Sequence, residues 1–357
     1  MHTPKKILFV PLDWGLGHAS RCIPLIQHCL NLGYEVIIGG NEITNSLLRI
    51  EFPHLQYLLI KGYSVQYSKF KWMLPLSILM QIPKLVLRMK HENSWLNRMI
   101  DKYQIDMVVS DNRYGLYSKK IPSFFITHQL QIQVPQSKWI QYLVNKINHN
   151  LIRKFTLCLV PDYLNENMAG KLSQATNLSH IEYIGNLSRF NKTHELEFKY
   201  DLLILLSGPE PQRSLLEKQL LQEISASSSK TLVVRGKPNS KENLINTNTI
   251  QYANHLTAHE LQEAILSSKI IIARSGYSTV MDLIKLNKHA ILIPTPGQTE
   301  QEYLAKYLSE KNWFLYAEQQ HLSISKMMNE YHKFNFSAFP NWKFDQYKSS
   351  LLSIFNR

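Results

Sequence analysis

Short apolar runs that alternate with helix-like segments are the feature of this chain that most restricts its fold. Residues 6–12 form the first apolar run, and Cys22, Ile26 and Cys29 then recur at helical spacing before a second run at residues 34–40. Apolar runs of this length, bounded by turn residues, are typical of buried parallel strands. A strand, a helix and a second strand in this order predict a parallel pair joined by a right-handed crossover.

The same alternation continues along the chain and then starts a second time at Asp201. Further strands of the first series are expected at residues 57–60, 105–110, 123–127, 157–161 and 181–184. Strands of the second series are expected at residues 201–206, 231–234, 270–273 and 290–294. Two such series predict an α/β fold of two doubly wound, Rossmann-like parallel-sheet domains that face each other across a cleft. We place the first domain at residues 1–185, the second at 186–335 and a C-terminal tail at 336–357.

The charge of the chain favours an anionic partner. The formal net charge is +13, and such an excess suits a phosphorylated substrate or an acidic membrane surface. The sequence holds no aromatic-plus-basic recognition motif, so we expect no nucleic-acid partner. Its three cysteines lack paired spacing, which argues against a disulfide framework or a metal site. The first apolar run is too short for a signal peptide, and no stretch reaches membrane-spanning length without a charge or a proline. We therefore expect a cytoplasmic protein.

Ligands of open parallel sheets bind beyond the carboxyl ends of the strands, so the loops after each strand are candidate sites. The first such loop is Gly15-Leu16-Gly17-His18. Its glycines let a ligand approach the backbone N–H groups at the start of the next helix. Ser20 stands where the dinucleotide fingerprint has its third glycine. The loop therefore predicts either an anion site or an ordinary glycine turn.

Two loops of the second domain join the end of a strand to the start of a helix. In the segment 207–210, Ser-Gly-Pro-Glu, Ser207 can cap the helix and leave backbone N–H groups for an anion. In the segment 274–279, Arg-Ser-Gly-Tyr-Ser-Thr, Gly276 lets a diphosphate approach the backbone and Arg274 supplies a forked pair of donors. Each segment predicts a phosphate site, and a plain helix start is the alternative.

Polar residues after Thr279 extend this site toward a nucleotide sugar. Asp282 lies within the helix that this segment opens, where a carboxylate can accept from ribose hydroxyls or be an ordinary solvated residue. The next loop, residues 294–301, reads Pro-Thr-Pro-Gly-Gln-Thr-Glu-Gln. Its last polar side chains offer donors and acceptors to sugar hydroxyls, and a polar surface loop is the alternative.

Together these loops resemble those of the family-28 glycosyltransferases. That family includes the enzymes that make the cell-wall lipid intermediate from UDP-linked N-acetylglucosamine, and plant-type galactolipid synthases. The Arg-Ser-Gly-x-x-Thr segment, the carboxylate at Asp282 and the Pro-Thr-Pro-Gly loop with its glutamine match the family in order and spacing. The loop that ends at His18 is similar to a shortened form of the family's N-terminal glycine-rich loop. Leu304 stands where the family has asparagine, which bears on the identity of the sugar.

The resemblance implies a GT-B fold, with the donor nucleotide in the second domain, the acceptor in the first, and the last helix crossing back to the first domain. It implies an inverting, metal-independent transfer whose co-substrate is a nucleotide sugar, expected to be UDP-linked, with no other cofactor. The implied contacts are Gly208, Ser275 and Gly276 for the diphosphate, Asp282 for the ribose, Gln298, Glu300 and Gln301 for the sugar, and His255 and Leu256 for the base. The wider binding set adds Gly15, Gly17, Ser207, Arg274 and Thr279.

The expected reaction is one displacement at the anomeric carbon by an acceptor hydroxyl. His18 is the first candidate for the general base, because imidazole suits proton transfer near neutral pH. Asp111 and His128 also follow expected strands and are rival candidates, each with a turn or cap role as the alternative. Arg274 and two helix N-termini would stabilise the charge that develops on the leaving diphosphate.

Two stretches, residues 69–90 and 138–155, combine apolar and aromatic side chains with lysine and arginine. Such segments suit the surface of an anionic membrane, and a pair of core helices with solvated cations is the alternative. A lipid-linked or sugar acceptor and a peripheral position on the inner face of a membrane would follow. Two other functions remain open: a nucleotide-sugar epimerase of the same fold, and a non-enzymatic protein that binds a nucleotide sugar or a lipid surface.

Overall fold

The computed structural model describes residues 4–13, 16–62, 74–134, 137–174, 178–191, 196–224, 228–242 and 244–355, with the backbone alone for 74–82 and 321. The chain divides into two compact units. The N-terminal unit comprises Met1–Trp14, His18–Leu187 and Trp342–Arg357, and the C-terminal unit comprises Gly15–Gly17 and Ser188–Asn341. The division therefore falls after residue 187 and again after residue 341, where the sequence analysis placed it after residues 185 and 335.

The N-terminal unit contains a parallel sheet with the strand order β3-β2-β1-β4-β5-β6-β7. Its strands are β1 (Lys6–Pro11), β2 (Glu35–Gly40), β3 (Gln56–Leu59), β4 (Met107–Asp111), β5 (Ser123–Ile126), β6 (Leu157–Val160) and β7 (Ile181–Tyr183). Its α-helices are α1 (Leu16–Asn31), α2 (Glu42–Glu51), α3 (Leu74–Tyr103), α4 (Lys138–Ile152) and α10 (Gln346–Phe355). The central strands are continuous apolar runs because both faces of the sheet are covered, and every residue of β4 is buried.

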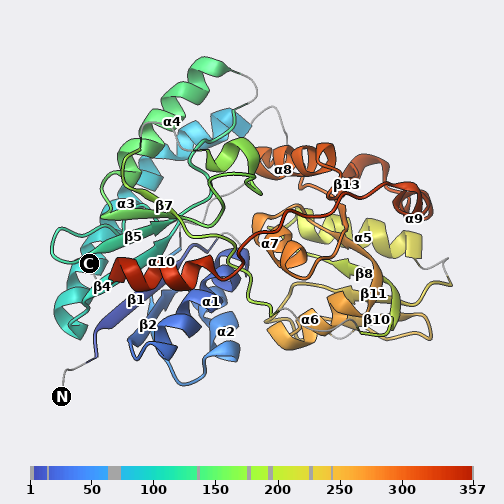
Figure 1. The fold of residues 1–357 in the computed structure, drawn as a ribbon, viewed down its shortest axis with the longest axis horizontal. Coiled ribbons are helices and arrows are strands. Elements are labelled where there is room, and N and C mark those ends of the chain that lie inside the picture. The colour runs from blue at the N-terminus through green and yellow to red at the C-terminus, as the bar shows by residue number, and fades with distance from the viewer. Residues whose placement is uncertain are drawn as a thin grey trace. The chain divides into compact units, whose positions relative to one another are not determined.

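Helices cover both faces of this sheet (Figure 1). Leu96 of α3 is part of the cluster on one face, and Ile152 of α4 packs with Phe125 of β5. Neighbouring strand residues point to opposite faces, and Phe124 contacts the ring of Phe355 in α10 at a centroid distance of 5.2 Å. The last helix of the chain is therefore part of the N-terminal unit.

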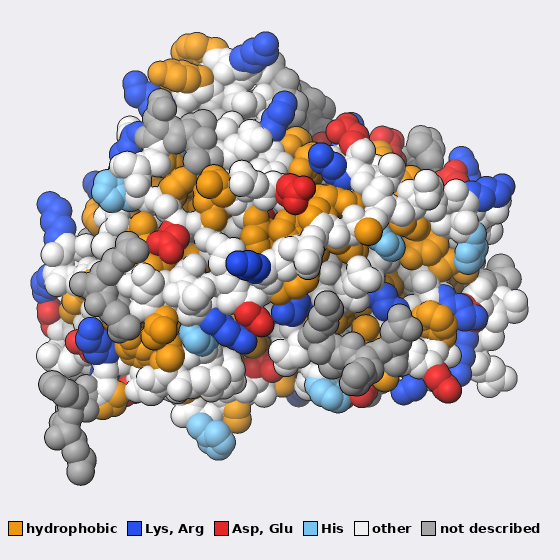
Figure 2. Space-filling model, viewed as in Figure 1, with side chains coloured by type: hydrophobic (Ala, Val, Ile, Leu, Met, Phe, Trp, Pro, Cys, Tyr) orange, Lys and Arg blue, Asp and Glu red, His pale blue; other side chains and the backbone are white. Residues whose placement is uncertain are grey.

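Helix α4 leaves most of its apolar side chains exposed. Only Asn148 and Ile152 of this helix are buried. Figure 2 shows hydrophobic side chains beside lysines and arginines over α4, at the top of the view. In the parts of the chain that the structure describes, no helix is both long enough and apolar enough to span a membrane.

The C-terminal unit contains a second parallel sheet with the strand order β10-β9-β8-β11-β12-β13. Its strands are β8 (Tyr200–Leu205), β9 (Thr231–Val234), β10 (Ile250–Ala253), β11 (Ser268–Ala273), β12 (Ile291–Leu292) and β13 (Leu315–Tyr316). Its α-helices are α5 (Gln212–Ile224), α6 (Ala258–Leu266), α7 (Tyr277–Lys285), α8 (Thr299–Glu310) and α9 (Ile324–Lys333). Strands β10 and β13 were not expected from the sequence. Both lie at the edges of the sheet, where the apolar pattern is shortest.

In each sheet the strand order reverses at one place, which is where a doubly wound sheet binds its ligand. In the N-terminal unit this place lies between β1 and β4, where Pro11 pairs with Asp111. In the C-terminal unit it lies between β8 and β11, where Leu205 pairs with Ala273. The loops that follow β1 and β4 therefore start next to each other, and so do the loops that follow β8 and β11.

Candidate functional site

Asp111 is the centre of a buried polar cluster at the carboxyl edge of the N-terminal sheet. It ends β4 and is fully buried. His18 and Arg21 lie three residues apart on α1, so their side chains share one face of the helix. The Nδ1 atom of His18 lies 2.9 Å from Oδ1 of Asp111. Arg21 donates to both carboxylate oxygens, from Nη2 to Oδ1 and from Nε to Oδ2, the latter at 2.6 Å.

These contacts fix the charge of Asp111. Burial by itself raises the pKa of the Asp111 carboxyl, but the charges of Arg21 and His18 and their hydrogen bonds outweigh it and hold this pKa well below its usual range. A carboxylate can only accept hydrogen bonds. Nδ1 of His18 lies 2.9 Å from the Asp111 carboxylate, which can only accept, and 2.9 Å from Nη2 of Arg21, which can only donate.

Exposure separates the three residues that the sequence offered as general bases. The His18 side chain is 20% exposed, whereas that of Asp111 is 1% exposed. His128, which follows β5, is 2% exposed, and Arg21 Nη1 lies 3.3 Å from its Nδ1. Because a guanidinium only donates, the lone pair on that nitrogen of His128 is occupied. Of the three, His18 is the one whose side chain has clear access to solvent.

A second buried ionic group lies beside the first and was not found from the sequence. Asn112 adopts a left-handed conformation, with φ of 54°, and Arg113 follows it. Arg113 Nε donates to Oε1 of Glu92 at 2.8 Å, and its Nη1 lies 3.6 Å from a carboxylate oxygen of Asp13. This group joins α3 to the loops after β1 and β4. An arginine after Ser-Asp-Asn gives no sequence signal for such a role.

In the C-terminal unit, the two glycines assigned to a diphosphate lie at loops after β8 and β11. Gly208 has φ of +99°, a left-handed backbone that favours glycine. Gly276 is different: its φ is −69°, and a Cβ atom built there would meet no atom within 4 Å. The folded chain therefore does not itself require glycine at position 276. Gly276 also provides no side-chain cap to the first turn of α7, and the start of a helix favours negative charge.

The side chain of Arg274 has several partners within the fold. Its side chain is fully buried, and burial lowers the pKa of Arg274 to about 10. Nη1 donates to the carbonyl of Pro294 at 3.0 Å and to Oε1 of Gln319 at 2.8 Å, and Nη2 donates to the carbonyl of Gln212 at 2.9 Å. These donors hold neighbouring loops together.

Ser275 has a similar structural role. It is fully buried, and its hydroxyl donates to the carbonyl of Gln301 at 2.8 Å. The hydroxyl therefore ties the loop after β11 to α8. Ser207 and Thr279 are half-buried beside these glycines, so their hydroxyls remain candidates for phosphate contacts. Gly15 lies outside the described residues, and Gly17 falls in the first turn of α1.

Asp282 is buried in α7 and has partners within its own unit. Ser188 Oγ donates to its Oδ1 at 2.7 Å, and Arg189 Nε lies 3.5 Å from its Oδ2. Burial raises the pKa of the Asp282 carboxyl, and these partners offset that effect only in part. A ribose hydroxyl would have to share or displace the Ser188 contact, which the sequence analysis did not anticipate.

The glutamines assigned to the sugar shape their own loop. Gln301 Oε1 accepts from the backbone N–H of Thr295 at 2.9 Å, and its Nε2 donates to Oε1 of Gln298 at 2.5 Å. Glu300 is half-buried in the first turn of α8. Leu304, where the resembling family has asparagine, is fully buried. Of this set, Gln298 and Glu300 have partly exposed side chains that a sugar could contact, whereas the side chains of Gln301 and Leu304 are buried.

The residues assigned to the base precede α6. His255 and Leu256 are both half-buried. Burial and the charge of Arg189 lower the pKa of His255, and Glu260 opposes that shift. A capping box between Thr257 and Glu260 fixes the start of the helix directly after them. His255 therefore lies just before a helix start whose position the capping box defines.

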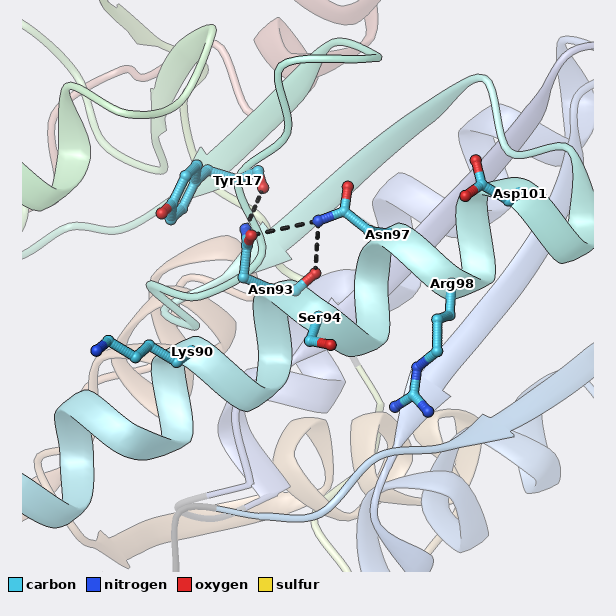
Figure 3. Close-up of a pocket in the computed structure, with 7 residues that line it drawn as sticks. All are labelled: Lys90, Asn93, Ser94, Asn97, Arg98, Asp101 and Tyr117. Atoms are coloured by element: carbon cyan, nitrogen blue, oxygen red, sulfur yellow. Dashed lines mark hydrogen bonds between the residues drawn. The ribbon is translucent and has the colours of Figure 1, made fainter.

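A hollow of about 460 Å³ lies on the outer side of α3. Figure 3 shows its polar lining, in which Asn93 donates to the carbonyl of Tyr117 at 2.7 Å and Asn97 donates to the carbonyl of Asn93 at 3.0 Å. None of the site residues expected from the sequence lines this hollow. Within the described ranges, no group of three or more histidine, cysteine or acidic side chains is placed to hold a metal ion.

Comparison with known proteins gives consistent matches over the chain. Residues 211–339 match the glycosyltransferase family 28 C-terminal domain. An uncharacterized glycosyltransferase of Methanosarcina acetivorans is 23% identical over 86% of this chain and 84% of its own length. A processive diacylglycerol beta-glucosyltransferase of Bacillus licheniformis is 21% identical over 85% of this chain and 81% of its own. Among solved structures, the spinosyn rhamnosyltransferase SpnG aligns over 99% of this chain and 100% of its own, with a TM-score of 0.65 and 12% identity.

Proposed function

Because this chain is a family-28-like GT-B glycosyltransferase, we propose that it transfers a hexose from a UDP-linked donor to an acceptor hydroxyl, with inversion and without a metal. The observation that carries this proposal is the His18–Asp111 pair, with its Nδ1 to Oδ1 distance of 2.9 Å. A buried carboxylate that orients a partly exposed imidazole is the arrangement of an activated general base. The base removes a proton from the acceptor, which is the step that a transferase needs.

The proposed reaction is a single displacement. The acceptor oxygen forms a bond to the anomeric carbon while the bond from that carbon to the diphosphate oxygen breaks, and the diphosphate leaves with the bonding electrons. The acceptor proton passes to Nε2 of His18. Asp111 accepts the hydrogen bond from Nδ1 throughout and stabilises the imidazolium that forms. Of the two rival candidates for the general base, Asp111 instead orients His18, and His128 lies next to this pair without a role in the proton transfer.

The donor would bind at the carboxyl edge of the C-terminal sheet. The open space in front of Gly276 and the uncapped first turn of α7 suit a diphosphate, because that end of a helix favours negative charge. Gly208 would approach the same group from the loop after β8. Asp282 would accept from the ribose, His255 would contact the base, and Gln298 and Glu300 would contact the sugar. In this proposal the dipole of α7 stabilises the negative charge on the leaving diphosphate, which the sequence analysis had assigned to Arg274 as well.

A product assay tests this proposal. Purified protein is incubated with UDP-glucose, UDP-galactose and UDP-N-acetylglucosamine, each with EDTA and with diacylglycerol vesicles. We expect UDP release and a β-linked product in the presence of EDTA. A requirement for a divalent cation, or an α-linked product, would contradict the metal-independent inverting reaction. An epimer formed from the UDP-sugar without an acceptor would replace the transferase with an epimerase.

We also propose that the acceptor is lipid-linked and that α4 lies on an anionic membrane surface, which makes the protein peripheral on the inner face of the membrane. Trp139, Tyr142 and Ile147 of α4 are 69%, 64% and 59% exposed. The sequence from His128 to Val160 contains three lysines and one arginine but no acidic residue. Aromatic and aliphatic side chains next to cations suit a lipid interface. The name of the Bacillus relative gives diacylglycerol as an acceptor for that protein.

The second basic stretch expected at a membrane, residues 69–90, falls partly outside the described residues. Its side chains are described only from residue 83 onward. In that part, Val86 and Leu87 of α3 are 40% and 57% exposed. Their exposure fits a membrane-facing surface but adds little evidence for one, so the membrane proposal rests on α4.

Vesicle co-sedimentation tests the membrane proposal. We expect the protein to sediment with vesicles that contain anionic lipid, and not with neutral vesicles, at moderate salt. The double variant Trp139→Ser/Ile147→Ser should lose most of this binding. Leu164→Ser is the matched control, because Leu164 is also 68% exposed in the N-terminal unit but lies outside α4. Equal binding of both variants would contradict a role for α4, and no binding of the wild type would contradict membrane association.

A further inference from the structure

Thr295 carries a buried hydroxyl that the folded chain does not use. It follows β12 at the carboxyl edge of the C-terminal sheet, in the loop that also contains Gln298. The residue is 2% exposed, and its Oγ1 atom has no hydrogen-bond partner among the described residues. A buried polar group of this kind costs free energy unless something else bonds to it. The reaction proposed above gives this side chain no role.

The backbone around Thr295 is fixed on both sides, so its hydroxyl has a defined position. Arg274 Nη1 donates to the carbonyl of Pro294 at 3.0 Å. The N–H group of Thr295 donates to Oε1 of Gln301 at 2.9 Å. The carbonyl of Thr295 accepts from the N–H group of Gln298 at 3.1 Å. Within the described parts of the chain, the hydroxyl is therefore the polar group of Thr295 that is left without a partner.

Gly208, in the loop after β8, leaves open space directly beside this hydroxyl. A Cβ atom built on Gly208 would lie 3.5 Å from Oγ1 of Thr295. Apart from residue 208 and its chain neighbours, no other described atom lies within 4 Å of that Cβ position. Gly208 itself is exposed. A ligand that approaches the backbone of Gly208 from this side therefore comes close to the hydroxyl of Thr295.

The surroundings favour a phosphate oxygen as the partner of this hydroxyl. A hydroxyl donates well to an anionic oxygen, and a glycine lets such a ligand approach the backbone. Strands β8 and β11 are neighbours in the sheet, so the start of α7 contributes its dipole at the same edge. Gln298, a proposed contact of the sugar, lies three residues further along the loop of Thr295. This order places Thr295 beside the phosphate that carries the sugar.

We propose that Thr295 donates a hydrogen bond to the sugar-bearing phosphate of the donor, and so selects nucleoside diphosphates over nucleoside monophosphates. The hydroxyl is held in place before the ligand binds, which lowers the entropic cost of the contact. This inference rests on the proposed function, in which a nucleotide sugar binds at this edge of the C-terminal sheet.

The variant Thr295→Val tests the inference, because valine keeps the shape of threonine and removes only the hydroxyl. Calorimetry measures the Kd of UDP and of UMP. We expect the Kd of UDP to rise about ten- to a hundredfold, as for the loss of a hydrogen bond to a charged group. The Kd of UMP should stay at the wild-type value. Thr295→Ser restores the hydroxyl and should bind UDP nearly as the wild type does. Unchanged UDP binding in Thr295→Val, or an equal loss for UDP and UMP, would overturn the proposal.

Thermal unfolding of the free protein gives a second readout, with the opposite sign. Removing a buried hydroxyl that has no partner should leave the Tm of Thr295→Val unchanged or raise it. Thr231→Val is the matched control. Thr231 is also fully buried in the C-terminal unit, but its hydroxyl donates to the carbonyl of Ser229 at 3.1 Å, and it lies at the start of β9. That variant should lose stability and bind UDP as the wild type does. A lower Tm in Thr295→Val would mean that its hydroxyl has a partner in the fold, and the inference would fail.

The binding data also separate this inference from the proposed function. TDP and GDP are measured beside UDP, each against its monophosphate, because the hydroxyl would contact the second phosphate whatever the base. If one of them binds in place of UDP and loses affinity in Thr295→Val, the UDP-linked donor is wrong and the role of Thr295 stands. If sugar is transferred from a UDP donor while Thr295→Val binds UDP as the wild type does, the proposed function stands and the role of Thr295 fails. If the wild type binds no nucleoside diphosphate, both fail.

Discussion

Near the place where its sheet reverses strand order, each unit of the molecule has a buried carboxylate, Asp111 in one and Asp282 in the other, and the pKa values of these two carboxyls shift in opposite directions. Asp111 is fully buried, receives two donors from Arg21 and lies 2.9 Å from Nδ1 of His18, and its pKa is held well below the usual range. Asp282 is also buried, and it receives the Ser188 hydroxyl at 2.7 Å, the backbone N–H of Arg189 and a longer contact from the Arg189 guanidinium at 3.5 Å. Its pKa is raised by burial.

The difference indicates two kinds of task. A carboxylate whose charge is fully compensated inside the protein is part of a permanent structure, and Asp111 accordingly holds the ring of His18. A buried carboxylate whose partners do not offset its desolvation is destabilising in the free protein. Additional donors from a ligand would stabilise it, which fits the proposed contact between Asp282 and ribose hydroxyls. The predictions below apply the same kind of change to both sides of this comparison.

The largest effect is expected from Asp111→Asn. This change leaves the buried guanidinium of Arg21 without its counter-charge, and breaking a buried ion pair from one side destabilises by about 3–5 kcal/mol. Urea unfolding near neutral pH measures the loss. A loss below about 1 kcal/mol would mean that Arg21 and Asp111 do not form the compensated pair described here.

The matched change in the other unit, Asp282→Asn, should have the opposite effect on the free protein. The neutral amide no longer carries the desolvation penalty of the buried charge, so the free energy of unfolding should stay the same or rise by about 1 kcal/mol. Stabilisation of the protein by UDP in thermal unfolding should fall, because a hydrogen bond to a charged group contributes about 1.5–3 kcal/mol to binding. Unchanged UDP stabilisation would remove Asp282 from the ribose site.

The pH dependence of these two variants sharpens the comparison. The folded pKa of Asp111 lies below its unfolded value, so its contribution is present above about pH 4 and is lost as the pH falls through the folded pKa. The folded pKa of Asp282 lies above its unfolded value, so its penalty develops as the pH rises above about 4. Unfolding measured at about pH 2.5 and about pH 7 should therefore show both differences from the wild type shrinking at the lower pH. A difference that grows at low pH for either variant would contradict the assigned direction of its pKa shift.

The smallest effect on stability is expected from Gly276→Ala. A Cβ at this position meets no protein atom within 4 Å, and its φ of −69° is open to alanine, so stability should change by less than about 1 kcal/mol. The Cβ would instead enter the space proposed for the diphosphate, and UDP should stabilise this variant less than the wild type. Gly208→Ala is the control, because φ of +99° at that residue makes alanine strained in the free protein. If UDP stabilises Gly276→Ala as it does the wild type, the diphosphate does not lie against α7.

The sequence was informative wherever a pattern is local. The alternation of apolar runs located all of the strands in the N-terminal unit, and the glycine-containing loops fell at the two switch points. Strand β13, which is Leu315–Tyr316, is too short to give a pattern of its own. Strand β10 has an exposed residue, Gln251, on the edge of its sheet, so its apolar run is broken.

The roles of charged side chains were the part that the sequence could not supply. Arg274 has the same position in the motif whether it faces a ligand or the carbonyls of Pro294 and Gln212, and only the fold shows the latter. Arg21 follows His18 by one turn, but its partner Asp111 lies 90 residues away in the chain. Such pairings depend on which strands become neighbours, and a single sequence carries no local trace of that.

The central claim of this account is that His18, oriented by Asp111, removes the proton of the acceptor. Its most direct test is the turnover of His18→Ala at saturating donor and acceptor, with His28→Ala as the matched control, since His28 lies on the same helix and contacts only the carbonyl of Lys348 and the ring of Tyr347 among its described partners. We predict that kcat falls by about two to four orders of magnitude in His18→Ala and stays near that of the wild type in His28→Ala. A His18→Ala enzyme with the turnover of the wild type would contradict the claim.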